Sequence, residues 1–209
     1  MTPPIRGTGT AVILLLLAAL AGCAPFSLVT PERRTVGGAI SVEPGMRWNR
    51  MEMAPYQGRV EVWTLDGPLL NSLVFFTGVP DGEPLFVSRA LASDPKQEKP
   101  PVFRSAMNPL EIEELFTATI ARNFRTAIVS ATNLRPAEVA GTPGFRFETR
   151  FVGRDEVERA GVFVGTVRGG KLYGAWFQGA RLHYYERYVP EVEKMAASAR
   201  LVGEAASAR

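Results

Sequence analysis

The stretch FRFETRFV, residues 145–152, decides the fold of this chain. Its residues alternate with a period of two, which is the pattern of a β-strand with one dry face and one wet face. The dry side carries Phe145, Phe147, Thr149 and Phe151. The wet side carries Arg146, Glu148 and Arg150. We therefore expect a strand here that covers a core with only one of its faces.

Two more strands are expected downstream of this stretch. Residues 161–168 and 171–178 flank Gly169-Gly170, and a glycine pair between two apolar runs is typical of a tight β-hairpin. Three consecutive strands between residues 145 and 178 predict an antiparallel meander.

A second hairpin is expected upstream. Residues 59–65 alternate, Asp66-Gly67 provides a turn, and residues 69–77 return as a more apolar strand. The run AIVSA, residues 127–131, is a candidate for a short buried strand.

Two helices are also indicated. Asn108, followed by Pro109 and Glu111, is typical of a helix start with a capping box, and apolar residues then recur at helical spacing. A second helix is expected over residues 181–201. Pro190 should divide it into a short piece and a helix that begins at the proline, because proline cannot donate a backbone hydrogen bond.

Together these elements predict the α+β fold class, with an antiparallel sheet of two hairpins plus the meander and two main helices packed on it. We expect a single domain over residues 39–202, because no linker or internal repeat divides this range. The charged, proline-rich segment 93–101 is expected to be an exposed loop, and residues 203–209 a frayed tail.

The start of the chain has a pattern of its own. The uncharged apolar run 11–20 follows Arg6 and leads into Leu20-Ala21-Gly22-Cys23. It is about half the roughly 20 residues that a membrane-spanning helix needs, but it matches the apolar region of a secretory signal. The last four residues resemble the lipobox of a bacterial lipoprotein. The alternatives are an uncleaved anchor or a secreted protein cut near Ala24.

The lipobox resemblance implies a signal peptide over residues 1–22, cleavage between Gly22 and Cys23, and acylation of Cys23. Two or more acyl chains hold a protein stably on a membrane, so we expect a membrane anchor followed by a flexible tether over residues 23–38. In the Gram-negative pattern, aspartate after the cysteine favours the inner membrane. Ala24 occupies that position, which favours the periplasmic face of the outer membrane.

Composition narrows the class of partner. The formal net charge is only +3 over 209 residues, and the chain contains no block of like charges and no basic, aromatic-rich stripe. Cys23 is the only cysteine, so no intramolecular disulfide can form. We therefore exclude nucleic acid as a partner and expect the membrane and another envelope protein instead.

Three segments in the C-terminal part resemble the PsbP/Mog1-like family. They are GFRFETRF (144–151), KLYGAWFQG (171–179) and YYERYVPEVEKMAASARL (184–201). The resemblance implies an α+β fold and an assembly or accessory role, and the family is not linked to a shared reaction.

The motifs give no catalytic residue. His183 is the only histidine, so a multi-histidine zinc site cannot form, and Cys23 is committed to the lipid. Neither a Gly-x-Ser-x-Gly nucleophile elbow nor a phosphate-binding loop is present. We expect no metal, no cofactor and no enzymatic activity.

A binding surface is expected on the wet face of the sheet and at the start of the last helix. Its candidate residues are Trp63, Arg146, Arg150, His183 and Tyr184. The leading hypothesis is a non-catalytic envelope lipoprotein that binds or scaffolds another component. The alternatives are a hydrolase with a carboxylate pair in a deep pocket, and a carrier of a small amphipathic ligand, which needs an open cavity of several hundred Å³.

Overall fold

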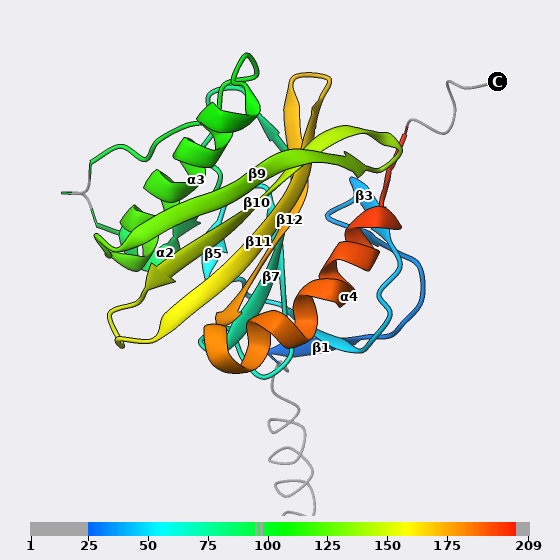
Figure 1. Cartoon of the computed structure of the whole chain (residues 1–209), viewed down its shortest axis with the longest axis horizontal. Helices are drawn as coiled ribbons and strands as arrows, with labels where there is room; N and C mark the ends of the chain where they lie inside the picture. The colour runs from blue at the N-terminus through cyan, green and yellow to red at the C-terminus, as the bar shows by residue number, and fades with distance from the viewer. Residues whose placement is uncertain (1–24, 95, 97, 204–209) are drawn as a thin grey trace, which may run out of the picture.

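The computed structural model describes residues 25–94, 96 and 98–203. Its centre is an eight-stranded antiparallel sheet with the strand order β1-β4-β6-β7-β12-β11-β10-β9 (Figure 1). In chain order the strands are β1 (Phe26–Val29), β4 (Trp48–Met51), β6 (Val60–Thr64), β7 (Asn71–Pro80), β9 (Val129–Val139), β10 (Thr142–Val152), β11 (Glu158–Arg168) and β12 (Lys171–Ala180).

The predicted meander is confirmed. β10, β11 and β12 are consecutive antiparallel strands, and their register places Phe163 between Phe147 and Trp176. Gly169 and Gly170 join β11 to β12 with φ angles of 55° and 72°. Two consecutive residues with positive φ make the turn whose twist matches a right-handed hairpin, which explains the glycine pair.

The predicted hairpin of β6 and β7 is confirmed as well, with Val62 opposite Val74. β7 then pairs with β12, so that Phe75 lies opposite Ala175. This pairing merges the hairpin and the meander into one sheet. The sheet is therefore larger than the predicted set of hairpins, because strands far apart in the sequence complete it.

Two helices cover opposite faces of the sheet (Figure 1): α3 (Pro109–Phe124) and α4 (Glu186–Ala197). The alternation in residues 145–152 explains this arrangement. Phe147 and Phe151 pack in the core beneath α3 with Phe116, whereas Arg146 points to the other face and bonds to α4. The sheet thus has an apolar layer on each side.

α3 begins as the sequence predicts. The Asn108 side chain accepts hydrogen bonds from the backbone N–H groups of Leu110 (2.9 Å) and Glu111 (3.0 Å). The Glu111 carboxylate accepts one in return from the Asn108 N–H (2.7 Å). This capping box satisfies donors that have no partner inside the helix.

The last helix is divided at a different place from the one predicted. Residues 181–185 form a π-helical turn, η1 (Arg181–Tyr185), and α4 begins at Glu186. Pro190 lies inside α4, close to its start, so the expected break at the proline is wrong. One missing backbone bond is tolerated there, because the following turns bury Val192 and Met195 against the sheet.

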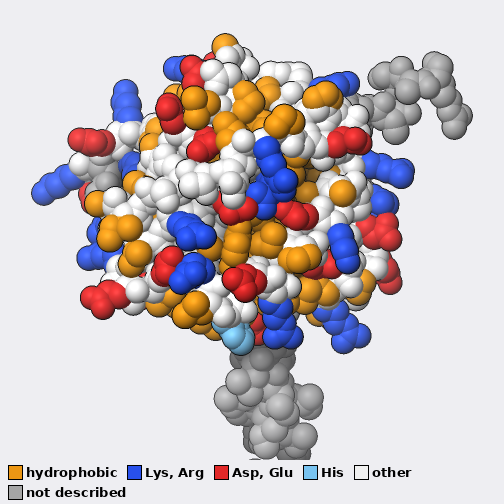
Figure 2. Space-filling view, in the orientation of Figure 1, with side chains coloured by type: hydrophobic (Ala, Val, Ile, Leu, Met, Phe, Trp, Pro, Cys, Tyr) orange, Lys and Arg blue, Asp and Glu red, His pale blue; other side chains and the backbone are white. Residues whose placement is uncertain are grey.

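Strand β9 corrects the prediction of a short buried strand over residues 127–131. It forms the edge of the sheet and pairs only with β10, and most of its side chains are at least partly exposed. Figure 2 shows charged side chains over the face that β9 and β10 share with α4. The apolar run AIVSA is therefore compatible with an edge, because only one side of the strand needs a core.

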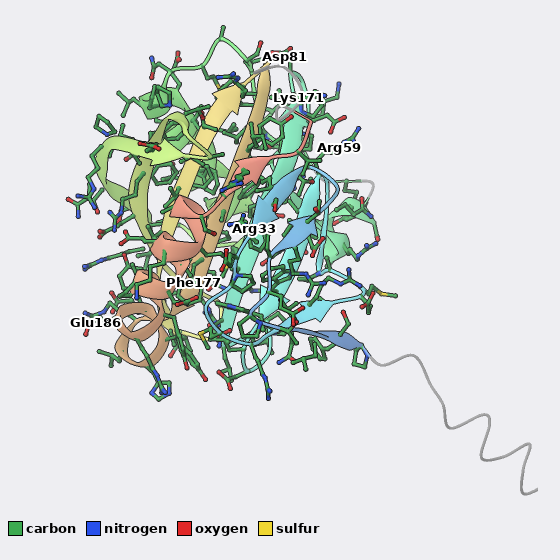
Figure 3. All side chains as sticks on the ribbon, turned by 90° about the vertical axis from the view of Figure 1, so that its right-hand side faces the viewer. Arg33, Arg59, Asp81, Lys171, Phe177 and Glu186 are labelled. Atoms are coloured by element: carbon green, nitrogen blue, oxygen red, sulfur yellow. The ribbon has the colours of Figure 1, made fainter. Side chains whose placement is uncertain are left out.

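The prediction of a tether through residue 38 is wrong for most of its length. β1 begins at Phe26, and Val29 and Val36 are fully buried in the core beneath α4. A small sheet lies beside the end of α4 (Figure 3). Its strands are β13 (Arg200–Leu201), β3 (Ile40–Val42) and β2 (Arg34–Val36). These strands are too short to show a period in the sequence.

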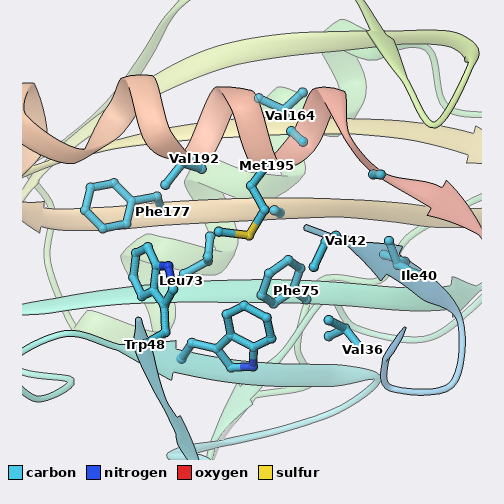
Figure 4. Close-up of a cluster of buried hydrophobic side chains, with 14 of the residues drawn as sticks. Val36, Ile40, Val42, Trp48, Leu73, Phe75, Val164, Phe177, Val192 and Met195 are labelled. Carbon is cyan, nitrogen blue, oxygen red and sulfur yellow. The ribbon is translucent and has the colours of Figure 1, made fainter. Parts of the chain in front are cut away.

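Figure 4 shows the core beneath α4, where Val192 and Met195 reach toward Leu73, Phe75 and Phe177 of the central sheet. The small sheet contributes further apolar side chains to this core. The N-terminal strands are therefore part of the globular domain.

The remaining elements are a two-stranded sheet, β5 (Tyr56–Gln57) with β8 (Val87–Ser88), and the short helix α2 (Arg89–Ala92). The predicted loop 93–101 connects α2 to α3, and its described residues contain no helix or strand. The predicted signal peptide (1–22, including Gly22), Cys23 and residues 204–209 of the predicted tail lie outside the described residues. Among the helices that the structure does describe, none is long and apolar enough to cross a membrane.

Candidate functional site

The charged side of β10 carries the candidate site. Arg146 lies opposite Val164 of β11, and Glu148 lies opposite Val162. Both valines belong to the core beneath α4, so the charged side chains lie at the margin of that core. The Arg146 side chain is only 10% exposed although it carries a full charge.

One guanidinium bridges two carboxylates at this margin. Arg146 Nη1 donates to Glu148 Oε1 (2.8 Å) on the same strand, and Arg146 Nε donates to Glu193 Oε1 (2.8 Å) on α4. Both hydrogen bonds are short and charge-assisted, which is what a buried charge requires to offset the loss of water. The network also ties α4 to β10.

The electrostatics follow from this geometry. Burial alone would raise the pKa of Glu148, but hydrogen bonds from Arg146 and Asn133 and the charges of Arg146 and Arg150 outweigh it. The pKa of this carboxyl therefore lies below its ordinary value. Burial also disfavours the charged form of Arg146, whereas its two carboxylate partners raise its pKa above the ordinary value. Arg146 and Glu148 are both charged at neutral pH.

Tyr185, the last residue of η1, stands beside the network. Burial, reinforced by the charge of Glu148, raises the pKa of its hydroxyl to about 12. The phenol stays protonated at neutral pH, and its ring packs against the core beneath α4.

Two adjoining hollows open over the network, and we call them together the β9–α4 groove. The first has a volume of about 360 Å³ and is lined by Asn133, Leu134, Arg135, Arg146 and Glu148. The second, of about 170 Å³, shares Arg135 and Arg146 and extends to Glu193 and Ala197 of α4. Figure 2 shows basic and acidic side chains gathered near the centre of this face.

One arginine of the groove, Arg135, forms no ion pair among the described residues. Arg135 lies opposite Arg146 across the β9–β10 pair, which places like charges face to face. Neither Arg135 nor Arg150 forms an ion pair within the part of the chain that the structure describes. Arg146 is shared between Glu148 and Glu193, so one positive charge faces two negative ones. The groove therefore presents charges of both signs, with Arg135 as its arginine outside the network and Glu138 as a further carboxylate in its lining.

Trp63 was predicted on this surface, and that prediction is wrong. Its ring is fully buried and packs edge-on against Phe75, with 4.7 Å between centroids. Its Nε1 donates to Glu61 Oε1 (2.8 Å). The register does put Trp63 on the same sheet face as Glu148. Trp63 is buried there because it belongs to the core beneath α4, to which the small sheet also contributes. The sequence could not show this burial.

The structure separates the other predicted residues into two places. Arg146 and Arg150 both lie on β10: Arg146 lines the groove, whereas Arg150 is exposed further along the strand. His183 and Tyr184 lie on η1, with His183 exposed and its ring against that of Tyr184 (4.7 Å between centroids). Burial, followed by the charge of Asp66, raises the pKa of Tyr184 above its ordinary value.

Sequence reasoning missed Glu193 and Arg135. The available signal was that an arginine on a half-covered strand needs an acidic partner. No neighbouring residue in the sequence indicates which carboxylate is that partner. Glu193 lies 47 residues from Arg146 in the chain. Arg135 becomes a candidate only once β9 is known to pair with β10.

The hydrolase alternative finds no support at this network. The Arg146 guanidinium occupies the space between Glu148 and Glu193, where a substrate would have to lie. The lowered pKa of Glu148 is also the opposite of what a general acid requires. In the acidic turn after β10, hydrogen bonds from Arg159 (2.9 and 2.7 Å) lower the pKa of Asp155 to about 2.

The carrier alternative finds no support in the core beneath α4. A small apolar cavity there, lined by Val42, Phe75 and Leu201 among others, has a volume of about 20 Å³. That volume suits roughly one water molecule and is far below what a small amphipathic ligand needs. Across the described residues, no group of three or more His, Cys, Asp or Glu side chains could hold a metal ion.

Comparison with known proteins bears on the fold. No protein-family model matches the sequence, and neither does any curated protein. Among solved structures, the chain is similar to the solution structure of cyanobacterial PsbP (CyanoP) from Synechocystis sp. PCC 6803, with a TM-score of 0.51. The chain has a PsbP-like fold. Sequence identity is 14%, over 86% of this chain and 94% of the cyanobacterial one, so the likeness concerns the fold alone.

The PsbP-like fold confirms the fold that the three C-terminal segments implied, and extends it to the N-terminal half, where the sequence showed no resemblance. It also corrects the proportions of the predicted architecture. The fold is mostly sheet, and the eight strands form one layer between α3 and α4.

Proposed function

We propose that this chain is a lipid-anchored accessory protein of the bacterial cell envelope, and that it binds another envelope protein in the β9–α4 groove. Cys23 carries the anchor, at the periplasmic face of the outer membrane. The PsbP-like fold is compatible with a non-enzymatic accessory role. The observation that carries the binding part of the proposal is Arg135, an exposed arginine that lines the open groove and forms no ion pair among the described residues.

The shape and chemistry of the groove favour a protein partner. The groove is open and has a mixed polar and apolar lining, whereas small-molecule sites are usually enclosed and mostly apolar. Edge strand β9 lies along it, but Pro136 has no N–H to offer and interrupts a continuous ladder with an added strand. Recognition therefore falls to side chains. A partner surface with exposed carboxylates would complement Arg135.

A photo-crosslinking amino acid at Leu134, which lines the groove, is expected to capture one discrete partner in native membranes. Adding Arg135→Glu should reduce this product several-fold, because the charge reversal repels the carboxylates of the partner. The measurement is the yield of the crosslinked band, followed by its identification by mass spectrometry.

Leu110, an exposed residue in the first turn of α3 on the opposite face, is the matched control position. It should give no such band. Equal bands from both positions, or a Leu134 band that Arg135→Glu leaves unchanged, would contradict binding in the groove.

Cys23→Ser is expected to abolish lipidation and to release the protein from the outer membrane, because serine has no thiol to acylate. The precursor should also keep residues 1–22. Incorporation of labelled palmitate, intact mass and membrane fractionation measure these effects. A serine variant that still carries labelled palmitate would refute the assignment of the anchor, and would leave the groove experiment unaffected.

A further inference from the structure

Large apolar side chains are exposed where β7 begins and β12 ends. Leu69, in the turn between β6 and β7, is 79% exposed, and Leu182, in η1, is 90% exposed. Single exposed leucines are common on protein surfaces and need no explanation. These two lie on neighbouring segments, because the Ala180 N–H donates to the Leu70 carbonyl (3.2 Å) and Leu182 follows directly after Arg181.

The turn that presents Leu69 is held in place by hydrogen bonds. The fully buried Asn71 accepts from the Leu65 N–H (2.7 Å) through Oδ1. The Leu70 N–H donates to the Gly67 carbonyl (3.0 Å), and Arg159 Nη2 donates to the Leu69 carbonyl (2.9 Å). The backbone is satisfied, and the Leu69 side chain is directed away from the domain. A fixed turn that exposes an apolar side chain is suited to a second surface.

The point where the chain enters the domain indicates what that surface is. Only Ala24 and Pro25 separate Cys23 from the first residue of β1, so the two Cα atoms lie at most about 11 Å apart. The Pro25 carbonyl accepts from the Glu52 N–H (3.1 Å), which fixes this entry point beside the residue that follows β4. Acyl chains on Cys23 would therefore hold the start of β1 at the membrane surface.

The two views agree on where this entry point lies. Figures 1 and 3 both place β1, the β6–β7 turn and η1 at the same, lower end of the molecule. Glu186, directly after η1, and Lys171, at the start of β12, are labelled at opposite ends in Figure 3. β1 adds Leu28, which is 59% exposed, to the apolar side chains at the lower end.

We propose that this end of the domain rests on the membrane, with Leu69 and Leu182 inserted among the lipid headgroups. The proposal rests on the lipid anchor proposed above, which brings the leucines to the bilayer. Tyr184 lies on η1 with Leu182, and its ring stacks on that of Tyr188 in α4, with 6.2 Å between centroids. Tyrosine has an apolar ring and a polar tip, and it is enriched where apolar and aqueous regions meet.

The proposed membrane contact includes the η1 residues His183 and Tyr184, which do not line the groove. The membrane contact lies at the end of the sheet, whereas Arg146 shares its cross-strand row with Phe75, four residues along β7 from Asn71. The groove therefore remains open to a partner while the domain sits on the bilayer.

An environment-sensitive fluorophore on a single cysteine tests the contact in the mature, lipidated protein. Acylated Cys23 cannot react with the label, so Leu69→Cys or Leu182→Cys gives one labelled site. The protein is bound to vesicles of phosphatidylethanolamine and phosphatidylglycerol. We expect a blue shift and quenching by lipids that carry a doxyl group at both positions, and neither effect at Lys171→Cys, the control at the other end of the molecule.

The possible failures are distinguishable. Intact mass first establishes whether Cys23 carries its acyl chains. A lipidated protein whose labels at 69 and 182 stay in water would overturn the membrane contact and leave the anchor standing. An unacylated protein would overturn both. A blue shift that appears without vesicles would show that a second copy of the chain covers the leucines, and would also overturn the proposal.

Discussion

Replacing Arg146 with methionine is expected to lower the free energy of unfolding by about 3 kcal/mol. The substitution keeps the length of the side chain but leaves Glu148 and Glu193 half-buried with no cation between them. Removing one member of a buried ionic network costs roughly 3–5 kcal/mol. The low end of this range applies because the Glu193 side chain is 38% exposed. Urea denaturation at pH 7 measures the change.

The matched control restores charge balance without the arginine. Arg146→Met combined with Glu148→Gln and Glu193→Gln should regain most of the lost stability, because no uncompensated charge remains. If the triple variant is as unstable as the single one, the loss came from packing of the arginine stem, and the ionic interpretation fails.

The pH dependence of the Arg146→Met effect gives an independent check. In the native protein the pKa of Glu148 lies below its ordinary value of 4.5. Its contribution to stability is therefore complete above pH 4.5 and is lost as the pH falls through the lowered value. Without Arg146, only the Asn133 hydrogen bond and the Arg150 charge oppose burial, so this pKa should rise and protonation should cost the variant less stability. The stability difference between the two proteins should narrow from pH 7 to pH 3, as unfolding at each pH would show.

Trp176→Ala is expected to have a similar or larger effect, about 3–5 kcal/mol. Trp176 is fully buried on β12 and lies among Phe86, Phe116 and Phe151, with ring centroids about 6 Å away. Alanine would leave a large cavity beneath α3 that the surrounding rings cannot close. Because native domains are stable by only about 5–15 kcal/mol, the variant should lie close to unfolding at 37 °C.

Trp176→Phe separates packing from hydrogen bonding at the same position. Trp176 Nε1 donates to the buried hydroxyl of Thr149 (3.1 Å), and phenylalanine keeps most of the ring but loses this bond. We expect a loss of about 1–2 kcal/mol, most of which should disappear when Thr149→Val is added, since no unpaired hydroxyl then remains. Thermal unfolding followed by circular dichroism measures both.

A Trp176→Ala loss below about 1 kcal/mol would mean that the rings do not form one packed core.

The sequence contained the information for elements whose causes lie within a few residues. The alternation of residues 145–152, the pair Gly169-Gly170 and the capping box at Asn108 each act through neighbours in the chain. Their predictions were confirmed in the structure. The same local logic failed at Pro190, where contacts of Val192 and Met195 with the sheet outweigh one missing hydrogen bond.

The site depends on contacts that the local pattern does not encode. The sequence placed Arg146, Glu148 and Arg150 on one face of β10, and this was correct. It also placed Trp63 on an open surface, whereas the short strands near the N-terminus fold back and bury that part of the face. A strand of three residues has too few side chains to display a period, so its presence becomes visible only when it pairs.

The chain by itself therefore determined its strand faces, its turns, its first long helix and the lipobox-like sequence around Cys23, because each is written in adjacent residues. Only the tertiary structure decided that β7 joins β12, that α4 brings Glu193 to Arg146, and that Leu69 and Leu182 share one end of the sheet. The physical reason is that pairing and packing bring together residues far apart in the chain. Many partners could satisfy a buried charge or an apolar face, and the geometry of the whole domain selects among them.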